Sequence, residues 1–149
     1  MSSRGSSGPG RVLVAVYAVL AIGASGRSVF QIVDRFREAP VAFTLSALAA
    51  VIYIVATLAL ALSMRRNGMN QQSWDRVAWV TIGFELVGVL VVGTLSVVSP
   101  GVLGLQSVDP FGRQATVWSL YGAGYLGIPL VLPILGLFWL DRRRRESAA

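Results

Sequence analysis

Residues 41–64 form an uninterrupted apolar stretch, VAFTLSALAAVIYIVATLALALSM, without a charged side chain. Because an α-helix rises 1.5 Å per residue, a helix of this length reaches about 36 Å, enough to cross the roughly 30 Å hydrocarbon layer of a bilayer. A helix on the surface of a soluble domain would instead carry a polar face along its length. The stretch therefore predicts a transmembrane helix.

Three more apolar stretches lie at residues 12–33, 77–98 and 119–140, and nearly all charged residues lie outside the stretches. This pattern predicts an all-α, multi-pass membrane protein with four transmembrane helices in one domain, residues 11–141. The Ser- and Gly-rich residues 1–10 are expected to be a disordered tail, and residues 142–149 a basic tail. Pro40 suits the first turn of the second helix, Ser73 is the predicted N-cap of the third, and residues 109–112 (DPFG) predict a turn.

All of the basic side chains are arginines, and their distribution predicts the orientation. The side that is richer in arginine holds Arg4, Arg11, Arg65, Arg66, Arg76, Arg142, Arg143, Arg144 and Arg145. The opposite side holds Arg35, Arg37 and Arg113, with Arg27 near it. Since cytoplasmic loops carry the excess of positive charge, we expect the N- and C-termini in the cytoplasm, with the cell membrane as the location. Tryptophans lie near the predicted helix ends, as interfacial anchors do, at Trp74, Trp79, Trp118 and Trp139.

The first apolar stretch has a second interpretation. Arg4 and Arg11 could form the basic region of a signal peptide, residues 12–22 its apolar region and residues 24–26 its small-residue cleavage site. The stretch stays apolar after Arg27, which favours a retained transmembrane helix. Both interpretations give the other helices the same orientation.

Residue types that are absent exclude several chemistries. The chain has no histidine, cysteine or lysine, which rules out disulfides, thiolate and histidine metal sites, a Ser-His-Asp triad and a Schiff base. The net charge of +6 does not indicate nucleic-acid binding, because the arginines flank apolar stretches and form no stripe on a soluble face. We therefore expect no catalytic residue, no cofactor and no metal.

Glu85 is the first candidate for a functional residue. It lies about 12 Å into the third predicted span, where an unpaired carboxylate costs about 2.5–3.5 kcal/mol. It should therefore face protein or water, or be protonated. Helical spacing places it on a stripe of small or polar residues, namely Ala78, Thr81, Glu85, Gly88, Val92 and Ser96.

Other helices supply polar groups at a similar depth. Tyr53 and Thr57 of the second span lie near the level of Glu85, and Pro129 and Pro133 interrupt the backbone hydrogen bonds of the fourth span. Together with Thr81 and Arg27 these residues form a candidate intramembrane polar layer. The layer is either a proton or substrate site, or a hydrogen-bonded contact that holds helices together.

Arg27 lies about 22 Å from the cytoplasmic end of its span, in the outer third of the membrane. One interpretation is that it extends outward toward Gln31 and Asp34. The other is a direct ion pair with Glu85, which would have to bridge a depth difference of about 10 Å.

Two further patterns have simpler explanations. Gly122, Gly124 and Gly127 have the spacing of a dinucleotide-binding fingerprint, but they lack the strand and βαβ unit which that site needs. They are expected to permit close helix packing. The arginines at residues 142–145 suffice as a topology determinant, although they could also bind anionic lipid.

Three stretches carry a resemblance: GRSVFQ at residues 26–31, ELVGVLVVGTLSVV at 85–98 and TVWSLYGAGYLGIPLVLPILGLFWL at 116–140. The chain from Arg11 to Leu140 resembles small actinobacterial four-helix integral membrane proteins of uncharacterised function. The resemblance implies the four-helix fold and no activity.

These observations lead to two functional hypotheses. The first is a non-enzymatic accessory or interaction protein of the cell envelope, with the lipid bilayer and a membrane protein or a second copy as partners. The second is a small, oligomeric proton-coupled transporter with Glu85 as the titrating site. An intramembrane aspartyl-type protease would need two facing acids, and only Glu85 lies at depth.

Overall fold

The computed structural model describes residues 7–65, 70–105 and 115–149. Within these ranges the chain is helical and forms no strand. The long helices are α1 (Ser7–Arg35), α2 (Pro40–Ser63), α3 (Gln71–Val98) and α4 (Ile128–Ala148). Three short 3-10 helices connect them, η1 (Phe36–Glu38), η2 (Pro100–Leu103) and η3 (Ser119–Tyr125).

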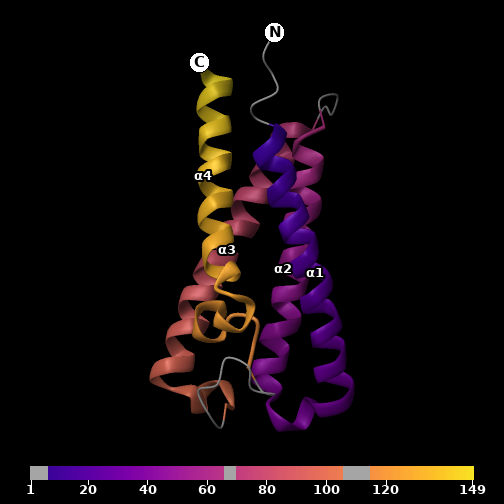
Figure 1. Ribbon diagram of the computed structural model, residues 1–149, viewed down its shortest axis with the longest axis vertical. Coiled ribbons are helices and arrows are strands. Elements are labelled where there is room, and N and C mark those ends of the chain that lie inside the picture. Colours follow the sequence, from indigo (N-terminus) through magenta and orange to yellow (C-terminus); the bar gives the residue numbers. More distant parts are fainter. Residues whose placement is uncertain (1–6, 66–69, 106–114) are drawn as a thin grey trace.

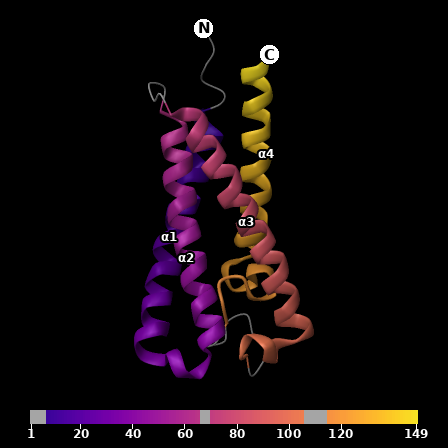
Figure 2. The same cartoon turned by 180° about the vertical axis from the view of Figure 1, so that it is seen from behind.

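The helices form an elongated bundle in which α1 and α2 run antiparallel side by side and α3 crosses them obliquely (Figures 1 and 2). The last helix, α4, packs mainly against α3, and its end lies beside the start of α1. Both described chain ends therefore lie at the same end of the bundle, as the sequence predicts.

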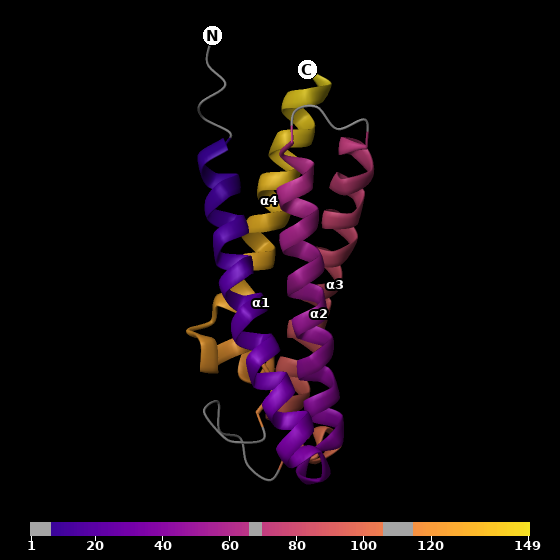
Figure 3. The same ribbon diagram turned by 90° about the vertical axis from the view of Figure 1, so that its right-hand side faces the viewer.

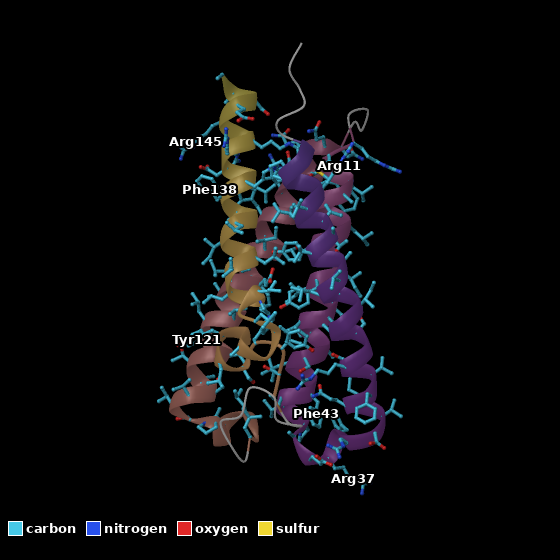
Figure 4. The ribbon with its side chains drawn as sticks, viewed as in Figure 1. Arg11, Arg37, Phe43, Tyr121, Phe138 and Arg145 are labelled. Carbon is cyan, nitrogen blue, oxygen red and sulfur yellow. The ribbon has the colours of Figure 1, made fainter. Side chains whose placement is uncertain are left out.

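The outer surface of the bundle is apolar, as expected for a protein whose helices are surrounded by lipid. Large apolar side chains are more than half exposed on every long helix, including Ile22, Val51, Val87 and Phe138. Figure 4 shows Phe138 pointing away from the bundle. Three helices, α1 to α3, are long and apolar enough to cross a membrane, and η3 with α4 makes a fourth candidate. The chain is an all-α, multi-pass membrane protein.

The fourth predicted span is not one straight helix. Residues 119–140 were expected to form one span that glycines and Pro129 and Pro133 interrupt. In the structure the break lies before both prolines, where η3 and α4 meet at an angle of 98°. Leu120, Tyr121 and Gly122 have positive φ angles of 50°, 58° and 81°, and Leu126 and Gly127 follow at 58° and 71°. Such left-handed residues cannot continue a right-handed helix. We call residues 115–148 the fourth segment. Its η3 turns pack mainly against α3, and Figure 3 shows them at the level of the lower half of α1.

Other helix ends also differ from the prediction. Helix α1 already begins at Ser7, inside the expected tail, and α4 includes most of the expected basic tail. Ser73 lies within α3, whose N-cap is Asn70, so the predicted cap was wrong. Pro40 begins α2 as predicted. The predicted turn at 109–112, and Arg4, Arg66 and Arg113, lie outside the described residues.

Helix α1 spans both halves of the first apolar stretch without a break, and Arg27 lies inside it. A continuous helix agrees with a membrane span. The retained transmembrane helix and the cleaved signal peptide both stay predictions.

Candidate functional site

Glu85 lies inside the bundle, on the face of α3 that the sequence pattern assigns to the interior. Its exposed fraction is 0%, and Ala78 and Val92 of the same stripe are also buried. The opposite face of α3 carries Val87, which is 59% exposed. The small residues along the inward stripe therefore allow neighbouring helices to approach the carboxyl group closely.

The carboxyl group of Glu85 has one hydrogen bond, and its donor comes from α1. Tyr17 Oη lies 2.7 Å from Glu85 Oε2, and Tyr17 is itself fully buried. The other oxygen, Oε1, is buried and has no hydrogen-bond partner among the described residues. The pair thus joins α1 to α3 and leaves one acceptor position of the carboxyl group unused.

A second hydrogen bond joins α2 to the fourth segment. Trp118 Nε1 donates to Tyr53 Oη at 3.0 Å, and both side chains are buried. The ring of Tyr53 also packs against the ring of Tyr17, with centroids 6.3 Å apart and an interplanar angle of 51°. Helices α1, α2 and α3 and the fourth segment therefore contribute one side chain each. We call these four side chains the central cluster: Tyr17, Tyr53, Glu85 and Trp118.

Residues next to Trp118 in the sequence hold its side chain in place for this contact. The hydroxyl groups of Thr116 and Ser119 lie 3.0 Å apart, and both bond to backbone amides of the same turn: Ser119 Oγ accepts from the Thr116 amide at 2.9 Å. Thr116 Oγ1 accepts from the Trp118 amide at 3.1 Å. On the facing helix Gly88 leaves room for the indole ring, since a Cβ atom there would lie 2.8 Å from it. The hydrogen bonds that the Thr116 and Ser119 hydroxyl groups accept from backbone amides favour a turn over a helix at this point.

The remaining members of the predicted polar layer contribute less directly. Thr57 Oγ1 donates to the carbonyl of Tyr53 in its own helix at 2.6 Å, and Thr81 is half-buried. Pro129 and Pro133 are both buried at the start of α4. The hydrogen bond of Glu85 comes from Tyr17 and not from a group of the proline-containing helix.

Arg27 makes a contact with the fourth segment that neither interpretation of the sequence named. Its Nη2 donates to the carbonyl of Ala115 at 2.7 Å, and its guanidinium lies 5.9 Å from the centroid of the Tyr125 ring. Gln31 Nε2 donates to the same carbonyl at 3.4 Å. Arg27 therefore holds the beginning of the fourth segment against α1, and no ion pair with Glu85 forms within the described residues.

Two members of the central cluster, Tyr17 and Trp118, are not in the polar layer that the sequence predicts. Tyr17 lies about 8 Å into its predicted span, a depth close to that of Glu85, and it carries the only polar side chain of residues 12–22. That match could have singled it out. Trp118 was predicted as an interfacial anchor, but it is 1% exposed, because the fourth segment turns inward before it becomes helical.

The central cluster offers groups for hydrogen bonding and one carboxyl group that can bind or release a proton. It holds one carboxyl group and two phenols, and among the described residues no three acidic side chains come together to hold a metal ion. Comparison with family models, with curated proteins and with solved structures gives no match to this chain. A function therefore has to be argued from these residues.

Proposed function

We propose that this protein is a non-enzymatic accessory or interaction protein of the cell membrane, with both termini in the cytoplasm. The orientation is supported by the arginines. Arg11 and Arg145 lie at the end of the bundle where the described chain starts and finishes, and Arg37 lies at the other end (Figure 4). The end that is richer in arginine faces the cytoplasm in membrane proteins generally.

The burial of the central cluster carries the proposal. Tyr17, Tyr53 and Glu85 are 0% exposed and Trp118 is 1% exposed. A transport site must open to solute at some stage of its cycle, whereas a contact that holds helices together stays closed. The cluster therefore acts as a joint between α1, α2, α3 and the fourth segment. With its interior occupied in this way, the bundle offers its outer helix faces and its ends to partners, either a membrane protein or a second copy.

A second candidate function, proton-coupled transport, is favoured by one observation. Glu85 Oε1 is a buried acceptor without a hydrogen-bond partner among the described residues, and Oε2 accepts a hydrogen bond from the phenol of Tyr17. Intramembrane acids often belong to proton paths. Transport would require the bundle to open around Glu85 during the cycle.

Substitution of Glu85 separates the two functions. Glu85→Gln keeps the shape and still accepts a hydrogen bond from Tyr17, but it cannot release a proton. The protein and the variant would be purified from membranes in mild detergent, and co-purifying proteins would be quantified by mass spectrometry. Proton flux would be followed in proteoliposomes with a pH-sensitive dye.

The accessory function predicts the same co-purifying partner for both proteins and no proton flux from either. A proton flux that the wild-type protein supports and Glu85→Gln abolishes would contradict it and establish the transporter. Glu85→Leu is the control for folding, since loss of the inter-helix hydrogen bond should lower the free energy of unfolding by about 1 kcal/mol under either function.

A further inference from the structure

A cleft of about 370 Å³ lies at the arginine-rich end of the bundle, between the start of α3 and the last turns of α4. It is separate from the central cluster. Arginines from both helices line it, together with one carboxylate and two apolar side chains: Asp75, Arg76, Trp79, Leu140, Arg143 and Arg144.

Ion pairing divides the arginines of α4 into three groups. Arg142 pairs with Glu146 at 3.1 Å and Arg145 with Asp141 at 2.9 Å, each along the surface of α4. Arg143 lies 3.6 Å from Asp75 and 3.1 Å from Ser63 Oγ, so it ties α4 to α3 and α2. Arg144 is different, since no carboxylate partner for it occurs among the described residues.

Arg76 of α3 has the same property. It lines the cleft, it is exposed, and within the described ranges it makes no ion pair. The one carboxylate in the cleft, Asp75, is already within reach of Arg143. Two guanidinium groups thus border the cleft without a counter-charge among the described residues. Both are strong, planar hydrogen-bond donors suited to phosphate.

The start of α3 adds to the positive potential. The first turn of α3 contains no acidic residue, and Asn70 makes no side-chain capping hydrogen bond. Gln71 and Gln72, whose backbone amides lack partners inside the helix, also line the cleft. A helix start in this state favours an anion, and here it adds to the two arginines.

The deeper side of the cleft is apolar. Trp79 lies one helical turn further into the membrane than Arg76, and Leu140 lies one turn further than Arg144. An amphipathic site with arginines toward the water and a tryptophan toward the hydrocarbon matches the headgroup level of a bilayer. A soluble phosphate would use the arginines alone, whereas a phospholipid would use both parts.

We propose that this cleft binds one anionic phospholipid of the cytoplasmic leaflet. Arg76 and Arg144 hold the headgroup phosphate, and Trp79 and Leu140 contact the first carbons of the acyl chains. The inference concerns a different part of the molecule from Glu85 and holds under either candidate function. It assigns distinct roles to neighbouring arginines that look equivalent in the sequence.

The test is native mass spectrometry of the detergent-purified full chain, titrated with phosphatidylglycerol or with phosphatidylcholine of the same acyl chains. We expect one phosphatidylglycerol to be retained in preference to phosphatidylcholine. Arg76→Gln and Arg144→Gln should each weaken retention about fivefold, which corresponds to about 1 kcal/mol per arginine near the membrane surface. Arg145→Gln, which removes the same charge outside the cleft, is the matched control and should change retention less than twofold.

Three results would overturn the proposal. Equal retention of both lipids by the wild-type protein would show that the cleft does not select an anionic headgroup. An equal loss in Arg145→Gln would show that only total charge matters. Displacement of the lipid by glycerol phosphate at equal concentration would identify a site for soluble phosphates, because the acyl chains would then contribute nothing.

Discussion

Helix α2 and the fourth segment are both apolar, and α2 and α4 each have a proline in the first turn. The two regions are nevertheless built differently. Helix α2 is continuous over its 24 residues and satisfies its own backbone hydrogen bonds. The fourth segment enters the bundle without helical structure, turns through left-handed residues, and becomes an α-helix only at Ile128. From there to Leu140 the helix is about 20 Å long, shorter than the hydrocarbon layer.

The fourth segment depends on other parts of the protein for contacts that α2 makes within itself. The amide of Leu120 donates to Ser96 Oγ on α3 at 2.8 Å, and Trp118 donates to Tyr53 on α2. Non-helical backbone at membrane depth is tolerated where protein surrounds it and supplies hydrogen bonds. We therefore expect α2 to tolerate substitution on its outer face and the fourth segment to be sensitive at the residues that anchor it.

The largest effect is expected at Gly122. Its φ angle of 81° is unfavourable for any other L-residue, and a Cβ atom would lie 2.7 Å from the ring of Pro129. Gly122→Ala should therefore lower the free energy of unfolding by about 3 kcal/mol, from backbone strain and overpacking together. Thermal unfolding in detergent, followed by circular dichroism, measures the change.

Gly127 provides the control that separates the two causes. Its φ angle is 71°, but nothing lies within 4 Å of an added Cβ atom. Gly127→Ala should cost only the backbone term, about 1 kcal/mol. Equal effects at the two glycines would mean that the contact with Pro129 does not fix the turn.

A smaller effect is expected at Trp118. Trp118→Phe removes the hydrogen bond to Tyr53 and part of a buried side chain, and it should cost about 2 kcal/mol. Val51→Ala on the outer face of α2, where Val51 is 56% exposed, should cost less than about 0.5 kcal/mol. A double-mutant cycle with Tyr53→Phe should give a coupling energy of about 0.6 kcal/mol. Additive effects of the two substitutions would argue against the hydrogen bond.

The smallest effect is expected at Leu126. A glycine there should raise the free energy of unfolding, whereas a glycine in α2 should lower it. Leu126 has a φ angle of 58° and is 89% exposed, so Leu126→Gly relieves strain and removes little packing. Because glycine also increases the entropy of the unfolded chain, the net stabilisation should be only about 0.5 kcal/mol. In α2, Leu58→Gly should instead destabilise the helix by about 1 kcal/mol. The same unfolding experiment resolves the two signs, and a destabilised Leu126→Gly would show that the side chain is needed at the turn.

The membrane-spanning character of the chain follows from the sequence, because the free energy of placing apolar residues in lipid depends on composition and length alone. The inward position of Glu85 follows as well, since helical periodicity sets which side chains share a face. The start of α2 at Pro40 is equally local. Each of these features depends on residues close together in the chain.

The partners of Glu85 and Trp118, and the position of the break in the fourth segment, depend on the tertiary structure. The Tyr17–Glu85 hydrogen bond joins residues 68 positions apart, and the sequence does not specify which of several polar groups at similar depth will meet. Residues 119–140 are apolar enough for a continuous span. The turn through Leu120, Tyr121 and Gly122 is stable because α2 and α3 supply hydrogen-bond partners and Gly88 supplies space, and these appear only when the helices pack.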